Sequence, residues 1–308
     1  MSVNLYLHRR ALTRLLVAVG GTLAIPAIAG PIESQGRIDR LSSIGGPGVA
    51  PREIEVWLPP TFDRDGRYAV VYMHDGQMLF DPNRTWNRQA WEIDRAATQL
   101  LASGEVRDFI IVGIHNDPAR RHAEFFPQAA LQYLGPGMIH DTFVERALGG
   151  RPASDDYLRF IVDVVKPEID SRYPTAVEKH STFIMGSSMG GLISLYAVGQ
   201  YPQIFGGAAA LSTHWIGTYE RNNEIPAALV AYLRTALPPP SSTRIYMDRG
   251  TTELDALYDT AQSNVDELMH DLGYQSPNFV SRIVDGAGHN EKAWAARARE
   301  PLKFLLRP

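Results

Sequence analysis

Short apolar runs and segments of helical spacing alternate along most of the chain. Residues 52–62, "REIEVWLPPTF", alternate apolar and polar positions before two prolines, which is typical of an edge strand that ends in a turn. Residues 68–76 and 108–116 are instead continuous β-branched runs bounded by turn residues, as expected of strands that are buried on both faces of a parallel sheet. Between these two strands, residues 91–101 have the spacing of a helix.

The second half of the chain continues this alternation. Two apolar runs, in "STFIMGS" and "FGGAAALSTHW", enclose a predicted helix, "GLISLYAVGQYP", and two more, in "TRIYMDRG" and "FVSRIVDGAGHN", enclose a helix from about Leu254 to Gly273. This alternation predicts one doubly wound α/β domain, with a mostly parallel sheet and helices on both faces. Residues 126–152 match neither period, and we expect them to cross one face of the sheet as a lid or a substrate-facing loop.

The first 29 residues carry a different pattern. A basic start, "HRRALTR", leads into an apolar run that ends in "AIA", which is the order of a secretory signal peptide. Arg9 and Arg10 resemble part of a twin-arginine signal, so the Sec and twin-arginine routes both stay open. An uncleaved anchor and an internal helix are the alternatives, although two glycines and a proline make the segment a poor membrane-spanning helix. We expect residues 1–29 to be removed, residues 30–308 to form the mature domain, and the protein to be periplasmic or extracellular.

Composition narrows the classes of function. The 308 residues include 30 Lys and Arg and 34 Asp and Glu, for a formal net charge of -4, and no block of like charge follows a phosphate backbone, so we expect no nucleic-acid partner. The absence of cysteine excludes disulfide bonds, thiolate metal sites and a cysteine nucleophile. After the N-terminal segment no run is long and apolar enough to span a bilayer, so we expect no stable membrane insertion of the mature protein.

The stretch "FIMGSSMGGLISLY", residues 183–196, carries the candidate chemistry. Its glycines fit the pattern G-x-S-x-G only if Ser188, rather than Ser187, is the central residue. At a turn from a strand into a helix, this serine adopts a strained backbone conformation that presents its hydroxyl above the edge of the sheet. The backbone N–H of Met189, at the start of the helix, is then a candidate donor to an oxyanion. The motif therefore predicts Ser188 as a nucleophile.

A serine nucleophile needs a general base, and the expected chain order is serine, acid, histidine. Of the nine histidines, His289 in "DGAGHNEKAW" follows a late strand in a glycine-containing loop, so we predict it as the base. His214, in "STHW", is expected at the same edge of the sheet but precedes the candidate acids. We interpret His214, with Trp215, as part of the pocket lining.

The acid of such a site is expected in the loop after "RIYMD". Asp248 still belongs to the predicted strand, and Asp259 lies a full turn into the predicted helix, which leaves Glu253 and Asp255. Either carboxylate can orient an imidazole and stabilise its positive charge. The residues themselves leave this choice open.

A second oxyanion donor is expected after the strand that contains "VVYMH", where "HDGQMLF" turns sharply at Gly76. The backbone N–H of Gln77 is the candidate. His74 and Asp75 resemble metal ligands by residue type, but no second cluster with ligand spacing accompanies them. We therefore expect no metal and no organic cofactor.

Taken together, these motifs resemble the putative esterase family of α/β-hydrolases, which includes enterochelin esterases, S-formylglutathione hydrolases, feruloyl esterase domains and mycolyltransferases. The resemblance implies the α/β-hydrolase fold over residues 30–308 and a serine hydrolase that cleaves carboxylic esters through Ser188, His289 and an acid. In relatives with a "GT..LDALY" loop the acid matches Asp255, so the resemblance favours Asp255 over Glu253. It covers nearly all of the mature chain and rests on "VYMHDGQMLFD", "IIVGIHN", "RRHAEFFP", "YLRFIVDVVKPEIDSRYPT", "IMGSSMGGLISLYA", "FGGAAALSTHW", "DRGTTELDALYD" and "GAGHNEKAWAAR".

The substrate is expected to be a small-molecule or carbohydrate-linked ester. Two other functions suit the same residues: an acyltransferase, in which an alcohol replaces water, and a ligand-binding module that has lost catalysis. Five aromatic residues are either a pocket lining suited to aryl or sugar esters or simply core, namely Trp86, Trp91, Phe125, Phe126 and Trp215. The sequence predicts no particular oligomeric state.

The N-terminal pattern predicts that the mature protein begins near Gly30 and lies outside the cytoplasm, because signal peptidases cleave after small residues such as those of "AIA". Intact-mass spectrometry of the periplasmic or secreted protein measures this start. An intact Met1 on protein from a soluble cytoplasmic fraction would contradict the prediction.

Overall fold

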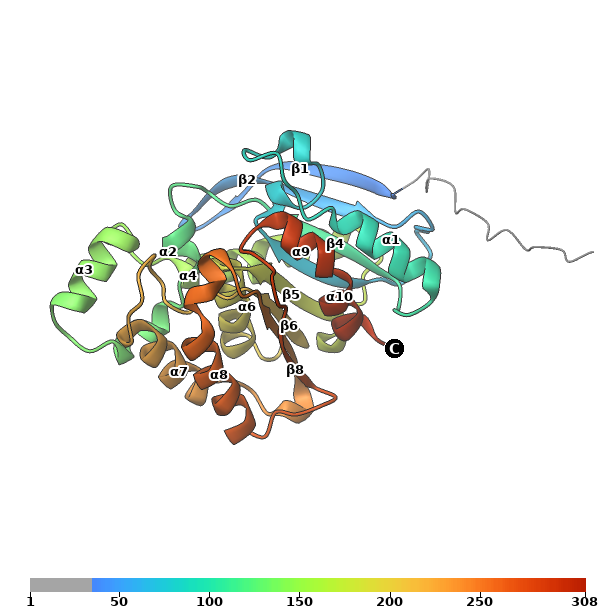
Figure 1. Cartoon of the computed structure of the whole chain (residues 1–308). Coiled ribbons are helices and arrows are strands. Elements are labelled where there is room, and N and C mark those ends of the chain that lie inside the picture. Colours follow the sequence, from blue (N-terminus) through green and yellow to red (C-terminus); the bar gives the residue numbers. More distant parts are fainter. Residues whose placement is uncertain (1–34) are drawn as a thin grey trace, which may run out of the picture. The chain divides into compact units, whose positions relative to one another are not determined.

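An eight-stranded sheet organises the part of the chain that the computed structural model describes, residues 35–308 (Figure 1). The expected signal peptide, residues 1–29, lies outside the described residues. The strand order is β1-β2-β4-β3-β5-β6-β7-β8. β1 and β2 run antiparallel to each other and β2 antiparallel to β4, whereas every other pair is parallel. The strands are β1 (Arg37–Gly46), β2 (Val49–Leu58), β3 (Ala69–His74), β4 (Phe109–Ile114), β5 (Thr182–Ser187), β6 (Gly207–Leu211), β7 (Arg244–Arg249) and β8 (Phe279–Ile283).

Each strand that the sequence predicted has a counterpart among β2 to β8, but β1 was missed. β1 has many polar residues and all of its positions are exposed or half-buried, so it lacks the apolar run of a buried strand. Because β1 pairs with one side of β2, β2 is not the edge strand that its alternation predicted. The edge lies one strand further out.

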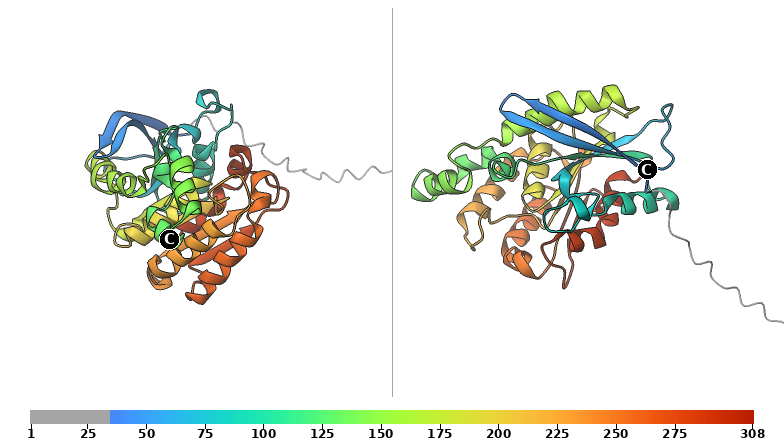
Figure 2. Two further views of the ribbon diagram at one scale, coloured as in Figure 1. Left: turned by 90° about the vertical axis from the view of Figure 1, so that its left-hand side faces the viewer. Right: turned by 90° about the horizontal axis from the view of Figure 1, so that it is seen from above.

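Helices cover both faces of the sheet (Figure 2). Alternate residues of β3 pack into two separate cores: Val70 and Tyr72 into one, Val71 and Met73 into the other, as the period of a strand requires. The first core contains residues of α2 to α8, and the second contains residues of α1, α9 and α10. The helices are α1 (Ile93–Ser103), α2 (Arg121–Phe125), α3 (Met138–Ala147), α4 (Ser154–Phe160), α5 (Lys166–Arg172), α6 (Met189–Gln200), α7 (Glu224–Ala236), α8 (Asp259–Asp271), α9 (Glu291–Arg297) and α10 (Arg299–Leu306).

Two predicted segments differ in detail from the structure. The helix expected from about Leu254 is two elements, a 3-10 turn η7 (Glu253–Leu257) and then α8. The excursion of residues 126–152 contains a 3-10 turn, η3 (Gln128–Tyr133), and α3, which is drawn at the left of Figure 1. No helix within residues 35–308 has the length and apolarity needed to cross a membrane.

Candidate active site

Ser188 alone separates the central strand β5 from α6. β5 ends at Ser187 and α6 begins at Met189, and Ser188 has φ 57 and ψ -123. A non-glycine residue with positive φ outside the left-handed helical region is strained, at a cost of about 1–3 kcal/mol. The strand-to-helix turn expected from the motif is therefore present, with Ser188 and not Ser187 at its apex.

The glycines of the motif explain how so tight a turn is packed. A Cβ atom on Gly186 would lie 2.9 Å from the backbone of Gly190, closer than carbon atoms approach without displacement. The strand and helix can therefore approach each other only because no side chain lies between them. The backbone N–H of Ser188 donates to the Leu211 carbonyl at 2.9 Å and Gly191 N–H donates to the Ser188 carbonyl at 3.0 Å, which fixes both ends of the turn.

His289 and Asp255 meet at the carboxyl edge of the sheet. His289 lies in the loop between β8 and α9, and its Nδ1 is 2.5 Å from Asp255 Oδ1. Burial alone would raise the pKa of Asp255, but hydrogen bonds from His289 and Ser212 outweigh burial and hold this pKa below its usual value. An ionised carboxylate can only accept, so Nδ1 of His289 donates, and Nε2 of the neutral ring is left with a lone pair.

The backbone brings the two loops that carry this pair together. The N–H groups of Thr251 and Thr252 both donate to the carbonyl of Ala287, at 3.0 and 3.1 Å. A Cβ atom on Gly250 would lie 2.1 Å from the same carbonyl oxygen, so only glycine allows this approach. Gly250 N–H also donates to Asp255 Oδ2 at 2.5 Å.

A buried hydroxyl, that of Ser212, completes the environment of Asp255. Its Oγ receives Trp294 Nε1 at 3.0 Å and Arg297 Nη2 at 2.9 Å, and both of these groups can only donate. The Ser212 proton must therefore point at its third partner, Asp255 Oδ2, at 2.6 Å. Arg297 is itself paired with the buried Asp248 at 3.0 Å. Ser212, Trp294 and Arg297 lie in the segments "FGGAAALSTHW" and "GAGHNEKAWAAR", but the sequence predicted no role for these three residues.

Glu253, the other candidate acid, contacts the backbone of the histidine loop rather than the imidazole. Its side chain is exposed, and its carboxylate accepts from His289 N–H at 2.8 Å and from Asn290 Nδ2 at 3.2 Å. Asp248 is in β7, as expected. Asp259 is the first residue of α8 rather than a full turn into it, and it pairs with Arg221 on the surface.

The two predicted oxyanion donors lie at the starts of helical turns. Met189 is the first residue of α6, where backbone N–H groups have no partner inside the helix, and Gln77 is in the 3-10 turn η1 (Gly76–Met78) directly after β3. The left-handed residue of this turn is Asp75, with φ 56. Gly76 is needed instead for close approach, since a Cβ atom there would lie 2.6 Å from the backbone of Gly113.

Polar side chains hold this second turn in place. Arg121 forms two bonds with the Asp75 carboxylate, at 2.8 and 2.7 Å, and Asn116 Nδ2 adds a third at 2.5 Å. The backbone N–H of Asn116 also donates to Gln77 Oε1 at 3.1 Å. Burial alone would raise the pKa of Asp75, but the charge and hydrogen bonds of Arg121 outweigh it and lower this pKa. Asp75 is thus a structural anion.

Ser188, His289, Gln77 and Met189 line one cavity of about 580 Å³. Trp86 and Trp91 also line it, whereas Phe125, Phe126 and Trp215 are buried in the core. His214 faces the cavity as expected, but its neighbour Trp215 does not. None of the side chains described within residues 126–152 lines this cavity, and Phe143 of α3 lines a neighbouring one.

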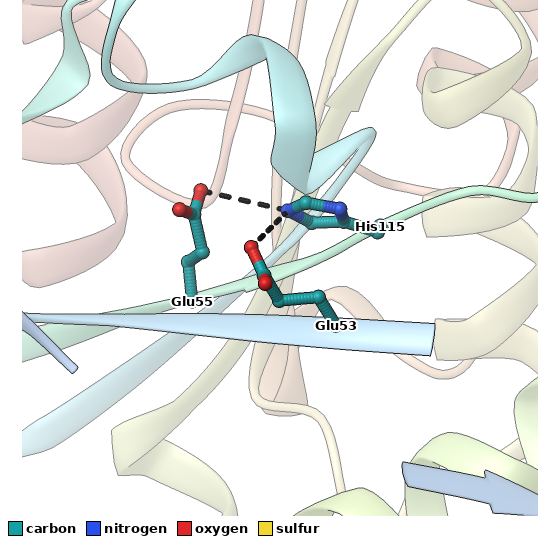
Figure 3. Close-up of side chains that lie close together, drawn as sticks. All are labelled: Glu53, Glu55 and His115. Carbon is teal, nitrogen blue, oxygen red and sulfur yellow. Dashed lines mark ion pairs between the residues drawn. The ribbon is translucent and has the colours of Figure 1, made fainter. Parts of the chain in front are cut away.

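A cluster of possible metal ligands lies elsewhere, at Glu53, Glu55 and His115, where one ligand atom of each lies within 4.8 Å of the others (Figure 3). No motif indicated this cluster, because His115 directly follows β4, the strand that pairs with β2, and is far from Glu53 and Glu55 in the sequence. Both carboxylates are already bonded to the guanidinium of Arg84, at 3.3 and 2.9 Å, and Glu55 also to Arg40 at 2.9 Å. Two positive charges therefore offset the two carboxylates, which disfavours a cation.

The family model of putative esterases matches residues 50–298. The chain belongs to the putative esterase family. As a member it is a carboxylic ester hydrolase, which confirms the family and the reaction class that the sequence predicted. This esterase is 25% identical over 263 residues to the uncharacterized protein YbbA of Bacillus subtilis (strain 168), a match that covers 82% of this chain and 92% of YbbA.

Solved structures show which fold this esterase has. It resembles an IroE-like serine hydrolase from Shewanella oneidensis (TM-score 0.67, 17% identity, 88% of this chain and 80% of that one). It also resembles the ferulic acid esterase AmCE1/Fae1A from Anaeromyces mucronatus (TM-score 0.60, 18% identity, 87% and 89%). A third similar structure is the enterochelin esterase from Shigella flexneri (TM-score 0.65, 18% identity). The match covers 87% of this chain and 57% of the enterochelin esterase. With the mostly parallel sheet, these likenesses confirm the predicted α/β-hydrolase fold.

The two acidic candidates can be separated by matched amide variants. Asp255→Asn should lower turnover on an activated ester on the order of ten-thousandfold, because the imidazole loses its oriented tautomer and the stabilisation of its charge. Glu253→Gln should cost about tenfold or less, because the amide oxygen still accepts from the backbone of His289. Steady-state kinetics, with folding checked by circular dichroism, compares them. A large loss for Glu253→Gln beside a near-normal Asp255→Asn would reverse the assignment.

Proposed function

We propose that this esterase cleaves carboxylic esters through an acyl-enzyme on Ser188, with His289 as general base and Asp255 as the acid that orients it. Ser188 Oγ attacks the ester carbonyl carbon while its proton passes to His289 Nε2. The tetrahedral intermediate then breaks its bond to the alcohol oxygen, which takes the proton from His289 and leaves as the alcohol. A water molecule attacks the acyl-enzyme in the same way and releases the carboxylic acid and free Ser188.

Two backbone N–H groups, those of Met189 and Gln77, are proposed to stabilise the oxyanion of each tetrahedral intermediate. Both belong to residues that line the Ser188 cavity, and both stand at the start of a helical turn, where N–H groups lack internal partners. Donors fixed in this way need no rearrangement as charge develops, which is why one such donor is typically worth about a hundredfold to a thousandfold in rate.

The observation that carries the proposal is the forced direction of the hydrogen bonds behind His289. Trp294 and Arg297 occupy Ser212 Oγ as donors, so Ser212 donates to Asp255, and Asp255 in turn accepts from His289 Nδ1. This series of hydrogen bonds places the proton of the neutral His289 ring on Nδ1. Nε2 therefore keeps a lone pair and can accept the proton of Ser188. The strained turn at Ser188, in the same cavity, supplies the nucleophile.

Ser188 should react covalently with a fluorophosphonate probe, and peptide mass spectrometry should place the adduct on Ser188. Ser188→Ala should lose both labelling and ester hydrolysis, with turnover falling on the order of a thousandfold or more, because both steps pass through its hydroxyl. Ser187→Ala is the matched control, since the two serines are adjacent, and it should keep the label. Loss of labelling in Ser187→Ala but not in Ser188→Ala would overturn the proposal.

A further inference from the structure

His214 lies beside the proposed nucleophile but has no part in the proposed chemistry. It is in the loop that follows β6, and its backbone N–H donates to the carbonyl of Ser188 at 3.2 Å. Its ring lines the cavity that Ser188 and His289 also line. The side chain therefore borders the cavity that an ester would enter to reach Ser188.

A buried tyrosine fixes the position of the ring proton of His214. Nδ1 of His214 is 2.6 Å from the hydroxyl of Tyr258, whose side chain is fully buried. Within residues 35–308 this hydroxyl has no other hydrogen-bond partner, so its proton would be unsatisfied unless it points at Nδ1. Tyr258 therefore donates, Nδ1 accepts, and the proton of the neutral ring is on Nε2.

The imidazole of His214 is neutral near pH 7. Burial lowers the pKa of His214 to about 3; the positive charge of Arg121, and that of His289 or His122 when either is protonated, acts in the same direction. The groups around the ring are these three and the rings of Tyr258 and Tyr219, at 5.7 and 6.1 Å between centroids. No carboxylate is among them, so nothing in the described part of the site favours the charged form.

The Nε2–H group is left without an acceptor. No hydrogen bond to Nε2 exists among the described residues, and this nitrogen is not among the fully enclosed polar atoms that lack a partner. A donor that stays unpaired costs free energy when a ligand displaces the water that had contacted it. A ligand that brings an acceptor avoids this cost.

We propose that Nε2–H of His214 is a fixed donor that selects esters with a second acceptor oxygen close to the scissile group. Hydroxyl, ether and carbonyl oxygens meet this requirement, so the class includes esters of polyols and sugars and esters of hydroxy acids. This inference rests on the proposed function, because it places the ester at Ser188. The donor discriminates mainly against alkyl esters of equal size, which leave it unpaired.

Isosteric substrate pairs test the inference on each side of the ester. On the acyl side, p-nitrophenyl methoxyacetate is compared with p-nitrophenyl butyrate, and on the alcohol side 2-methoxyethyl butyrate with butyl butyrate. The double variant His214→Phe/Tyr258→Phe removes donor and acceptor together, so that no polar group is left unpaired. The ratio of kcat/KM for the ether ester to that for the alkyl ester should fall about threefold to tenfold relative to wild type in one of the two pairs, and that pair identifies the side that His214 contacts.

His122→Phe is the control, because His122 also lines the cavity. His122→Phe should leave both kcat/KM ratios near their wild-type values. If a ratio fell as much as in the double variant, the preference for ether esters would reflect the general polarity of the cavity and not His214. Nitrogen-15 NMR of the imidazoles gives a second readout, in which His214 should carry its proton on Nε2 at neutral pH. Unchanged ratios in the double variant, or a proton on Nδ1, would overturn this inference alone. Absence of fluorophosphonate labelling at Ser188 in the wild type would overturn the proposed function, and this inference with it.

Discussion

The backbone at Ser188 is the constraint on which the rest of the site depends. A single residue connects β5 to α6, and its φ of 57 is one that a serine adopts only at a cost. Backbone hydrogen bonds with Leu211, Gly191 and His214 hold it there. Gly186 and Gly190 can also approach each other closely, because neither has a side chain. These contacts offset the strain. The resulting backbone conformation places the hydroxyl of Ser188 at the edge of the sheet, between β5 and α6, instead of within the helix.

Around this turn, buried polar groups form hydrogen-bond networks in which the donor and the acceptor of each bond are defined. Arg297 is paired with Asp248 and also donates to Ser212, which directs the Ser212 proton to Asp255. On the other side of β5, next to β3 and β4, Arg121 and Asn116 hold Asp75 and thereby the turn that contains Gln77. Both networks keep a carboxylate ionised although it is buried, because donors more than offset the loss of water. The result is a site whose donors and acceptors are in place before a substrate arrives.

Much of this arrangement could be predicted from the sequence, but only where the signal is local. Continuous β-branched runs identified β3 and β4, and the motif around Ser188 identified the turn, because each needs only neighbouring residues. β1 was missed because an exposed edge strand needs no apolar run. The choice between Asp255 and Glu253 was open because it depends on the backbone of the acid loop, which Gly250 brings against Ala287. Ser212, Trp294 and Arg297 meet only in the folded chain, so no spacing could reveal them.

The strain at Ser188 can be measured directly, by comparing the unfolding free energies of Ser188→Gly and Ser188→Ala in urea. Both variants lack the hydroxyl, so they differ in the Cβ atom, which alanine keeps in the strained conformation. Relief of strain of about 1–3 kcal/mol should exceed the entropic disadvantage of glycine of roughly 0.5–1 kcal/mol, so the glycine variant should be the more stable by about 1 kcal/mol. An alanine variant as stable as the glycine variant, or more stable, would contradict the account, because Ser188 would then be under no strain.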